Sequence, residues 1–231
     1  MSKEYETKTH IESQSSVPRE EALFDEMDSV GAWYPNAWTV VAKTITDVFS
    51  GANALIATLT GAGGLGSAGS IERKLPFVTQ RYINFEFAIG SRVGTNTTSA
   101  LYFSMQWWST SKSGLALFRI TTWSDAQQSL QIYNYSTSAW VTLEAVIYMA
   151  EETNKWLVVS GKIDTLSKKW VDLRLGGRVN TPTTIGIGTL ADIDANPSAD
   201  DVTYVQFYTD NMVSQTLIWV LDRFKFWGSS I

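Results

Sequence analysis

Apolar and polar positions alternate with a period of two along most of the chain after residue 22. Between residues 82 and 89, the odd-numbered positions are all large and apolar, while the even-numbered positions include Asn84 and Glu86. Successive side chains of a strand point to opposite faces of a sheet, so this pattern predicts half-buried β-strands. Residues 101–108 and 141–149 repeat it. We expect further strands at residues 39–45, 54–59, 115–122, 130–135, 157–163, 170–175, 184–190, 204–208 and 217–226.

The expected strands follow one another without helices between them. Thr, Val, Ile and aromatic residues fill them, as a pleated and half-buried surface prefers. Turn clusters rich in Gly, Ser, Asn and Asp separate them. The pattern therefore predicts an all-β fold, an antiparallel two-sheet β-sandwich or jelly roll, with an extended N-terminal arm. The uniform composition predicts a single domain over residues 23–231.

Residues 1–22 differ in composition from the rest of the chain. They hold three Lys or Arg, five Asp or Glu, and little that is apolar besides Ile11 and Val17. Such a segment buries too little surface to offset its ordering entropy. We expect a polar arm that becomes ordered only against its own domain or against a neighbouring subunit. Its candidate contact residues are Tyr5, His10, Ile11 and Val17.

Composition excludes several classes of chemistry. The formal net charge is −5, which disfavours a general nucleic-acid surface because phosphate binding needs clustered Lys and Arg. The chain has no cysteine, and its one histidine is His10 in the arm. Disulfides, thiol nucleophiles, cysteine-based metal sites and histidine-based triads in the folded body are therefore excluded. No apolar run reaches the ~18 residues of a membrane span, and we expect no secretory signal peptide.

An acidic segment near residue 195 has the opening of a calcium loop. Asp192, Asp194 and Asn196 supply alternate oxygen ligands, as a hard cation prefers. The EF-hand pattern then fails, because Pro197 stands where glycine is needed and Thr203 where a bidentate Glu is needed. A looser calcium site at these three residues remains the alternative to a solvated turn, and no other cofactor is expected.

The acidic residues do not form the pair that a glycosidase needs. Two carboxyl groups of such an enzyme stand ~5 Å apart or ~6.5 to 9.5 Å apart, and residues i and i+2 of a strand share a face. Glu144 is followed on its face by Val146 and Tyr148, and Glu86 is flanked by Asn84 and Ala88. We therefore predict no catalytic residue and expect that the protein is not an enzyme.

Aromatic residues make up 13% of the chain, with ten Trp, nine Tyr and ten Phe. We expect most of them to fill a wide core. Exposed aromatics beside polar side chains form platforms for sugar rings, and they also dominate protein–protein contacts. Trp108 and Trp123 are the best surface candidates, and Gln106 and Asp125 are the polar residues beside them. These four residues are the predicted carbohydrate-binding or partner-binding site.

The two ends of the folded body resemble the concanavalin A-like lectin/glucanase sandwiches. Residues 23–28, followed by Trp33 and Trp38, are similar to the opening strand of that family, and residues 219–227 are similar to its closing strand. Residues 155–177 resemble its run of strand, turn and strand. The resemblance implies a jelly-roll sandwich often used for carbohydrate binding. The catalytic Glu-x-Asp-x-x-Glu motif of the glucanase members is absent, so no catalytic or metal-binding residue is carried over.

Two functions fit these observations, with a third behind them. The favoured one is a non-enzymatic structural subunit of a virion, such as a capsid, capsid-surface or tail protein, whose arm contacts neighbouring copies or other virion proteins. The alternative is a lectin-like carbohydrate-binding module, and a glycoside hydrolase comes third. We expect a virion location if the chain is viral and a cytoplasmic one otherwise.

Overall fold

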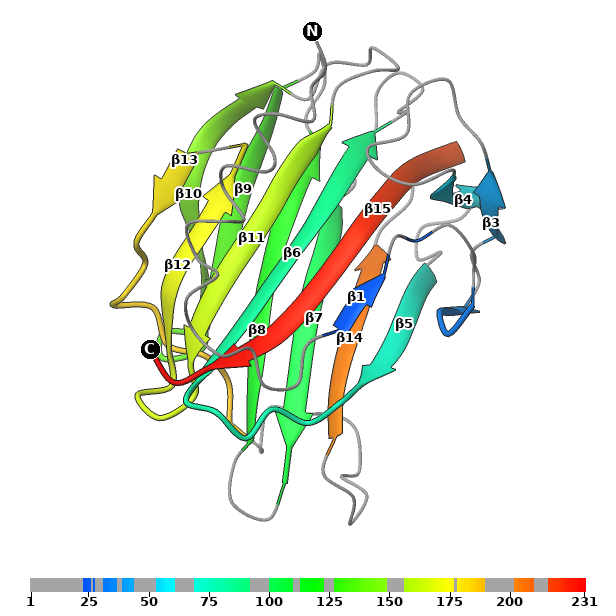
Figure 1. Cartoon of the computed structure of the whole chain (residues 1–231). Coiled ribbons are helices and arrows are strands. Elements are labelled where there is room, and N and C mark those ends of the chain that lie inside the picture. The colour runs from blue at the N-terminus through cyan, green and yellow to red at the C-terminus, as the bar shows by residue number, and fades with distance from the viewer. Residues whose placement is uncertain are drawn as a thin grey trace, which may run out of the picture.

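All the elements in the described part of the chain are β-strands. Figure 1 shows them in a computed structural model of residues 1–231. No helix long and apolar enough to cross a membrane occurs in this part of the chain. The predicted arm, residues 1–22, lies outside the described residues. The structure describes residues 23–25, 27, 31–36, 39–43, 53–60, 69–91, 100–109, 113–122, 127–148, 156–176, 178–189, 202–209 and 216–231.

The strands form two antiparallel sheets. The eight-stranded sheet has the order β13-β12-β11-β6-β15-β4-β3, with β1 also paired to β15. Its strands are β1 (Leu23–Asp25), β3 (Thr39–Lys43), β4 (Ala54–Thr60), β6 (Tyr82–Ser91), β11 (Leu157–Asp164), β12 (Lys169–Leu175), β13 (Arg178–Asn180) and β15 (Thr216–Ser229).

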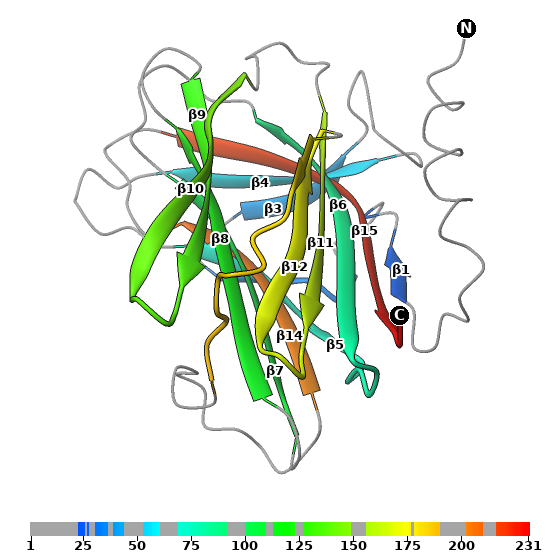
Figure 2. The same ribbon diagram turned by 90° about the vertical axis from the view of Figure 1, so that its left-hand side faces the viewer.

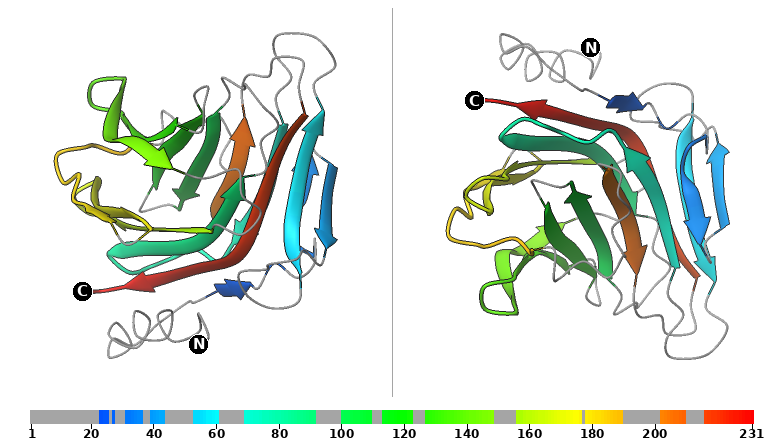
Figure 3. Two further views of the ribbon diagram at one scale, coloured as in Figure 1. Left: turned by 90° about the horizontal axis from the view of Figure 1, so that it is seen from above. Right: turned by 90° about the horizontal axis from the view of Figure 1, so that it is seen from below.

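The seven-stranded sheet has the order β10-β9-β8-β7-β14-β5-β2. Figures 2 and 3 show the two sheets as two layers of a sandwich. The strands of this second sheet are β2 (Tyr34–Asn36), β5 (Gly69–Leu75), β7 (Ala100–Trp108), β8 (Ser113–Thr122), β9 (Gln127–Asn134), β10 (Ala139–Tyr148) and β14 (Val202–Thr209).

Aromatic rings from both sheets meet in the core between the layers. Phe85 and Phe87 of β6 lie with their ring centroids 4.7 and 5.2 Å from that of Phe103 on β7. Phe103 in turn lies 5.2 Å from Phe207 of β14. The expectation that many aromatics fill the core therefore holds for these residues. Other large side chains that are fully buried are Met27, Trp33, Trp107, Phe118, Trp170, Phe224 and Phe226.

The predicted all-β sandwich is confirmed, and every predicted strand but one corresponds to a strand of the structure. The exception is residues 184–190, where Gly186 and Gly188 form only isolated bridges. This segment joins the two layers: Gly188 exchanges backbone hydrogen bonds with Leu115 of β8, and the amide of Trp170 in β12 donates to the carbonyl of Ile185. Because its backbone hydrogen bonds go in turn to strands of both sheets, the segment forms no continuous ladder with either sheet.

Strands β2, β5 and β13 were not predicted. In β5 the inward positions are Ile71, Arg73 and Leu75, and the charge of Arg73 interrupts the apolar pattern. The Arg73 guanidinium forms an ion pair with Asp25 of β1, and Asp25 also accepts a hydrogen bond of 3.1 Å from Trp33 Nε1. Burial lowers the pKa of Arg73, but the nearby carboxylate keeps the inward charge paired.

Candidate functional site on the outer face of the seven-stranded sheet

The strand β7 shows how the sequence divides the two faces of the seven-stranded sheet. Its odd-numbered residues from Leu101 to Trp107 face the core, and its even-numbered residues face outward. The outward set is Tyr102, Ser104, Gln106 and Trp108. Because the neighbouring strands are paired residue to residue with β7, their outward side chains continue the same rows across the sheet.

One row of outward side chains crosses six strands. Strand pairing aligns Ser70 (β5), Tyr208 (β14), Tyr102 (β7), Arg119 (β8), Gln131 (β9) and Thr142 (β10). We call this set the Arg119 row. It holds one cation and no acid, and its other members are aromatic, amide and hydroxyl side chains.

Arg119 is held in place by several contacts at the centre of this row. Its Nε donates to Gln131 Oε1 at 2.7 Å, and its Nη1 donates to the Tyr102 hydroxyl at 3.2 Å. Its Cζ lies 4.0 Å from the centroid of the Trp140 ring, which is a close cation–π contact. Gln131 is itself oriented by a hydrogen bond of 3.3 Å from its Nε2 to Thr142 Oγ1. The guanidinium is therefore fixed in a defined plane on the sheet.

Aromatic rings extend from Arg119 in both directions. Tyr102 stacks on Tyr208 with centroids 4.7 Å apart and planes 13° apart. On the other side, Trp140 contacts Tyr133 at 5.2 Å. Tyr133, Trp140 and Tyr208 are partly exposed, whereas Tyr102 is buried beneath its neighbours. Together these residues form a partly exposed aromatic surface with a fixed cation in the middle.

A second cluster on the same face surrounds Trp108. The side chain of Trp108 is only 5% exposed, because Leu115, Tyr135 and Tyr204 pack around it and Tyr204 stacks on it at 5.4 Å. The expectation that Trp108 is a surface residue is therefore wrong. Its Nε1 and the Oγ of Ser104 are buried, and neither has a hydrogen-bond partner among the described residues.

The other predicted site residues divide into those that the structure describes and those that it does not. Gln106 lies on the outer face, half-buried, between Tyr204 and Leu115 of the neighbouring strands. No group of three or more His, Cys, Asp or Glu suited to a metal ion occurs among the described residues. The predicted residues outside the described part are Trp123, Asp125, the calcium candidates Asp192, Asp194 and Asn196, and the arm residues Tyr5, His10, Ile11 and Val17.

Two charged residues of β5 lie on the outer face beside the Arg119 row. Glu72 stands between Tyr34 and Gln206, and Lys74 is exposed next to Tyr204. Glu144 of β10, by contrast, is held by Arg178 and Asn180 of β13, with oxygen–nitrogen distances of 3.2 and 2.9 Å. Glu144 therefore connects the edges of the two sheets and is not part of the aromatic surface.

The main residues of this site were not among the sequence candidates. Arg119 alternates with the core residues Phe118 and Ile120, and Tyr102 shares the face of Gln106. Alternation within each strand could therefore have placed each of them on an outward face. What the sequence does not give is which strands are neighbours and in which register, and this pairing is what assembles the row.

Comparison with known proteins shows the fold but no close relative. No protein-family model and no curated protein matches the chain. A carbohydrate esterase of the Shiga toxin-encoding bacteriophage phi24B is 14% identical with a TM-score of 0.55, covering 93% of this chain and 100% of that one. The carbohydrate recognition domain of Emp47p is 9% identical with a TM-score of 0.55, covering 94% and 98%. A putative β-glucanase from Mycobacterium abscessus is 11% identical with a TM-score of 0.51, covering 90% and 100%.

The resemblance to concanavalin A-like sandwiches is confirmed at the level of the fold. Two functional predictions are corrected by the same comparison. The prediction of a virion structural subunit is contradicted, because these similar structures are a carbohydrate esterase, a carbohydrate recognition domain and a glucanase. The prediction that the protein is not an enzyme is contradicted as well, because an esterase and a putative glucanase share the fold.

Proposed function

We propose that this protein binds a carbohydrate on the outer face of its seven-stranded sheet. The observation that carries the proposal is the aromatic surface around Arg119, in which Tyr208, Trp140 and Tyr133 are partly exposed beside the amide side chain of Gln131. The C–H face of a sugar ring packs on a flat aromatic ring, and its hydroxyl groups need hydrogen-bond partners.

Polar groups beside the aromatic rings support the proposal. Gln206 lies on the same face in the row next to the Arg119 row, Gln106 lies in the row after that, and each is half-buried. The buried Ser104 Oγ, which lies opposite Gln206 in the pairing of β7 with β14, is a further group whose hydrogen bond a polar ligand or water would satisfy. The carbohydrate-related proteins that share the fold point to the same class of ligand.

Binding to soluble polysaccharides tests the proposal. The wild-type protein is titrated with neutral and acidic polysaccharides, and tryptophan fluorescence and calorimetry measure the affinity. Trp140→Ala removes the ring in contact with Arg119, Tyr102 and Tyr133. An aromatic residue at the centre of a binding surface contributes about 2 kcal/mol, so we expect this variant to bind about thirtyfold more weakly than the wild type. Released sugars and acids are measured in the same samples, because enzymes share the fold.

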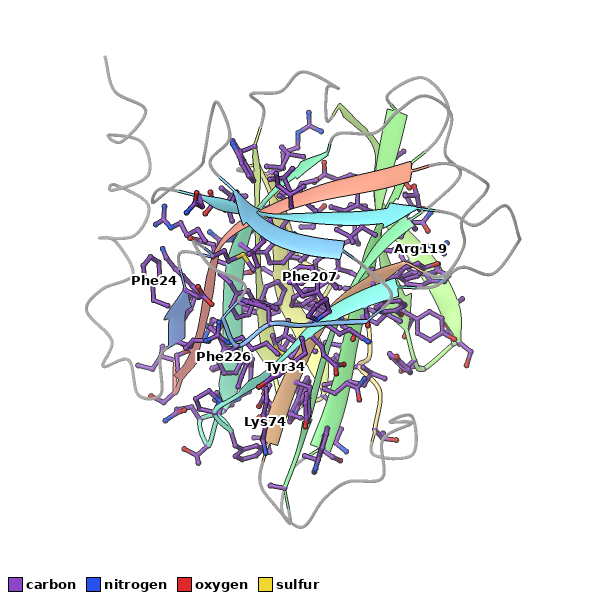
Figure 4. The ribbon with its side chains drawn as sticks, turned by 90° about the vertical axis from the view of Figure 1, so that its right-hand side faces the viewer. Phe24, Tyr34, Lys74, Arg119, Phe207 and Phe226 are labelled. Carbon is purple, nitrogen blue, oxygen red and sulfur yellow. The ribbon has the colours of Figure 1, made fainter. Side chains whose placement is uncertain are left out.

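Phe24→Ala is the matched control for Trp140→Ala. Phe24 is a 53% exposed aromatic residue of β1 in the eight-stranded sheet, and Figure 4 shows it on the opposite side of the molecule from Arg119. We expect this variant to bind as the wild type does. Equal binding by Trp140→Ala and the wild type would reject this face as the site, and the absence of binding to any polysaccharide would reject the function.

A further inference from the structure

The Arg119 guanidinium has unused hydrogen-bonding capacity. A guanidinium carries five N–H groups, and Arg119 uses one on Gln131 and one on Tyr102. Its Nη2 donates to no described residue, and Arg119 forms no ion pair with one. The part-exposed side chain thus presents an oriented cationic edge on the outer face.

Four other arginines of the described residues form ion pairs, whereas Arg119 forms none with a described residue. Arg73 pairs with Asp25, Arg81 with Asp164, Arg174 with Asp172 and Arg178 with Glu144. The Arg119 row, in contrast, contains no carboxylate. Glu144, two residues from Thr142 on β10, is already bound by Arg178 and Asn180. Glu72 lies on β5, three strands away from the strand of Arg119. A carboxylate that binds Arg119 must therefore come from outside the described residues.

We propose that the carbohydrate bound at this face is acidic and that Arg119 binds one of its carboxylate groups. The inference rests on the proposed function and specifies its ligand. A carboxylate matches the planar fork of a guanidinium and accepts two parallel hydrogen bonds from it. The sugar ring that carries this carboxylate then lies beside Tyr208 or Trp140, the partly exposed rings on either side of Arg119 and Tyr102.

The test compares each acidic polymer with its own neutral form. Polygalacturonate and polymannuronate are titrated next to the same polymers after chemical reduction of their carboxyl groups. We expect the acidic forms to bind the wild type more tightly, with an affinity that falls as salt is added, because part-exposed charges are screened. Arg119→Met keeps an unbranched side chain that reaches about as far as the Nε of arginine, but it removes the guanidinium with its charge and its donors. We expect this variant to lose roughly ten- to a hundredfold in affinity for an acidic polymer and little for its reduced form.

Two further variants make the test specific. Lys169→Gln removes one exposed cation from β12 of the other sheet and should leave binding unchanged, which controls for net charge. Arg119→Lys keeps the charge but loses the planar fork of donors, so we expect it to lose part of the preference for the acidic polymer. This variant replaces Arg119→Met in the test if Arg119→Met does not fold.

The outcomes separate this inference from the proposed function. Tighter binding of the acidic forms that depends on Arg119 supports it. If the reduced polymers or neutral polysaccharides bind as well as the acidic ones, or if Arg119→Met weakens both forms equally, the inference is wrong while carbohydrate binding stands. If no polysaccharide binds in any form, the proposed function is wrong and the inference is lost with it.

Discussion

The close approach of Gly161 to Phe85 leads to a quantitative prediction for the stability of the core. Gly161 of β11 is paired with Phe85 of β6, and both face the interior. A Cβ atom added at Gly161 would lie 2.4 Å from Phe85 Cζ and 2.6 Å from its Cε1. Carbon atoms that are not bonded prefer ~3.5 to 4.0 Å, so the ring would have to move by about 1 Å.

Neighbouring aromatic rings restrict the movement of the Phe85 ring. Its centroid lies 4.7 Å from that of Phe103, 6.1 Å from Phe118 and 6.3 Å from Trp170. Overpacking of such a site costs about 1–3 kcal/mol, and a site enclosed by rings belongs at the upper end. The change from glycine to alanine in a strand regains about 0.5–1 kcal/mol of backbone entropy. We therefore expect Gly161→Ala to lower the free energy of unfolding by about 2 kcal/mol.

Gly90→Ala is the matched control, because it makes the same chemical change in the adjacent strand. A Cβ atom at Gly90 would find its nearest neighbours in Trp156 at 3.6 Å, which is ordinary contact. We expect this variant to be neutral or slightly stabilising. Urea unfolding followed by fluorescence measures both, and about 2 kcal/mol corresponds to a melting temperature roughly 4–8 °C lower for a domain of this size. If Gly161→Ala is as stable as Gly90→Ala, the reasoning is refuted.

Two further predictions concern the turn between β11 and β12. Hydrogen bonds from Arg81, and then from the Ser167 and Leu166 amides, lower the pKa of the buried Asp164. The ionised carboxylate therefore stabilises the fold above pH ~4, and this contribution is lost as the pH falls below that value. Asp164→Asn should thus cost about 1–2 kcal/mol at pH 7 in urea unfolding and progressively less in acid, and a pH-independent difference would contradict this account. Lys168 has a φ of 54°, so Lys168→Gly should raise the melting temperature, and an unchanged or lower value would contradict the assigned strain.

Much of the fold could be predicted from the sequence because most strands have one buried face. In β6, four inward residues from Ile83 to Ile89 alternate with polar or small ones, and the strand was expected within two residues of its bounds. The pattern fails where tertiary contacts supply what the local sequence lacks. Arg73 can face inward in β5 because Asp25, from β1, pairs with it. The bulges of β10 around Glu144 similarly shift the residues that alternation would place inward.

The site was harder to predict than the fold, because its properties arise between strands. The exposure of Trp108 depends on Leu115, Tyr135 and Tyr204, and none of them belongs to β7. Arg119 meets Tyr102, which is 17 residues away, and Gln131, which is 12 residues away, only because β7, β8 and β9 pair in one register. A slip of one residue in that register would turn Arg119 away from its partners. The chemistry of this face is therefore a consequence of strand pairing, and a search for aromatic residues along the chain selects Trp108 instead of the exposed surface around Arg119.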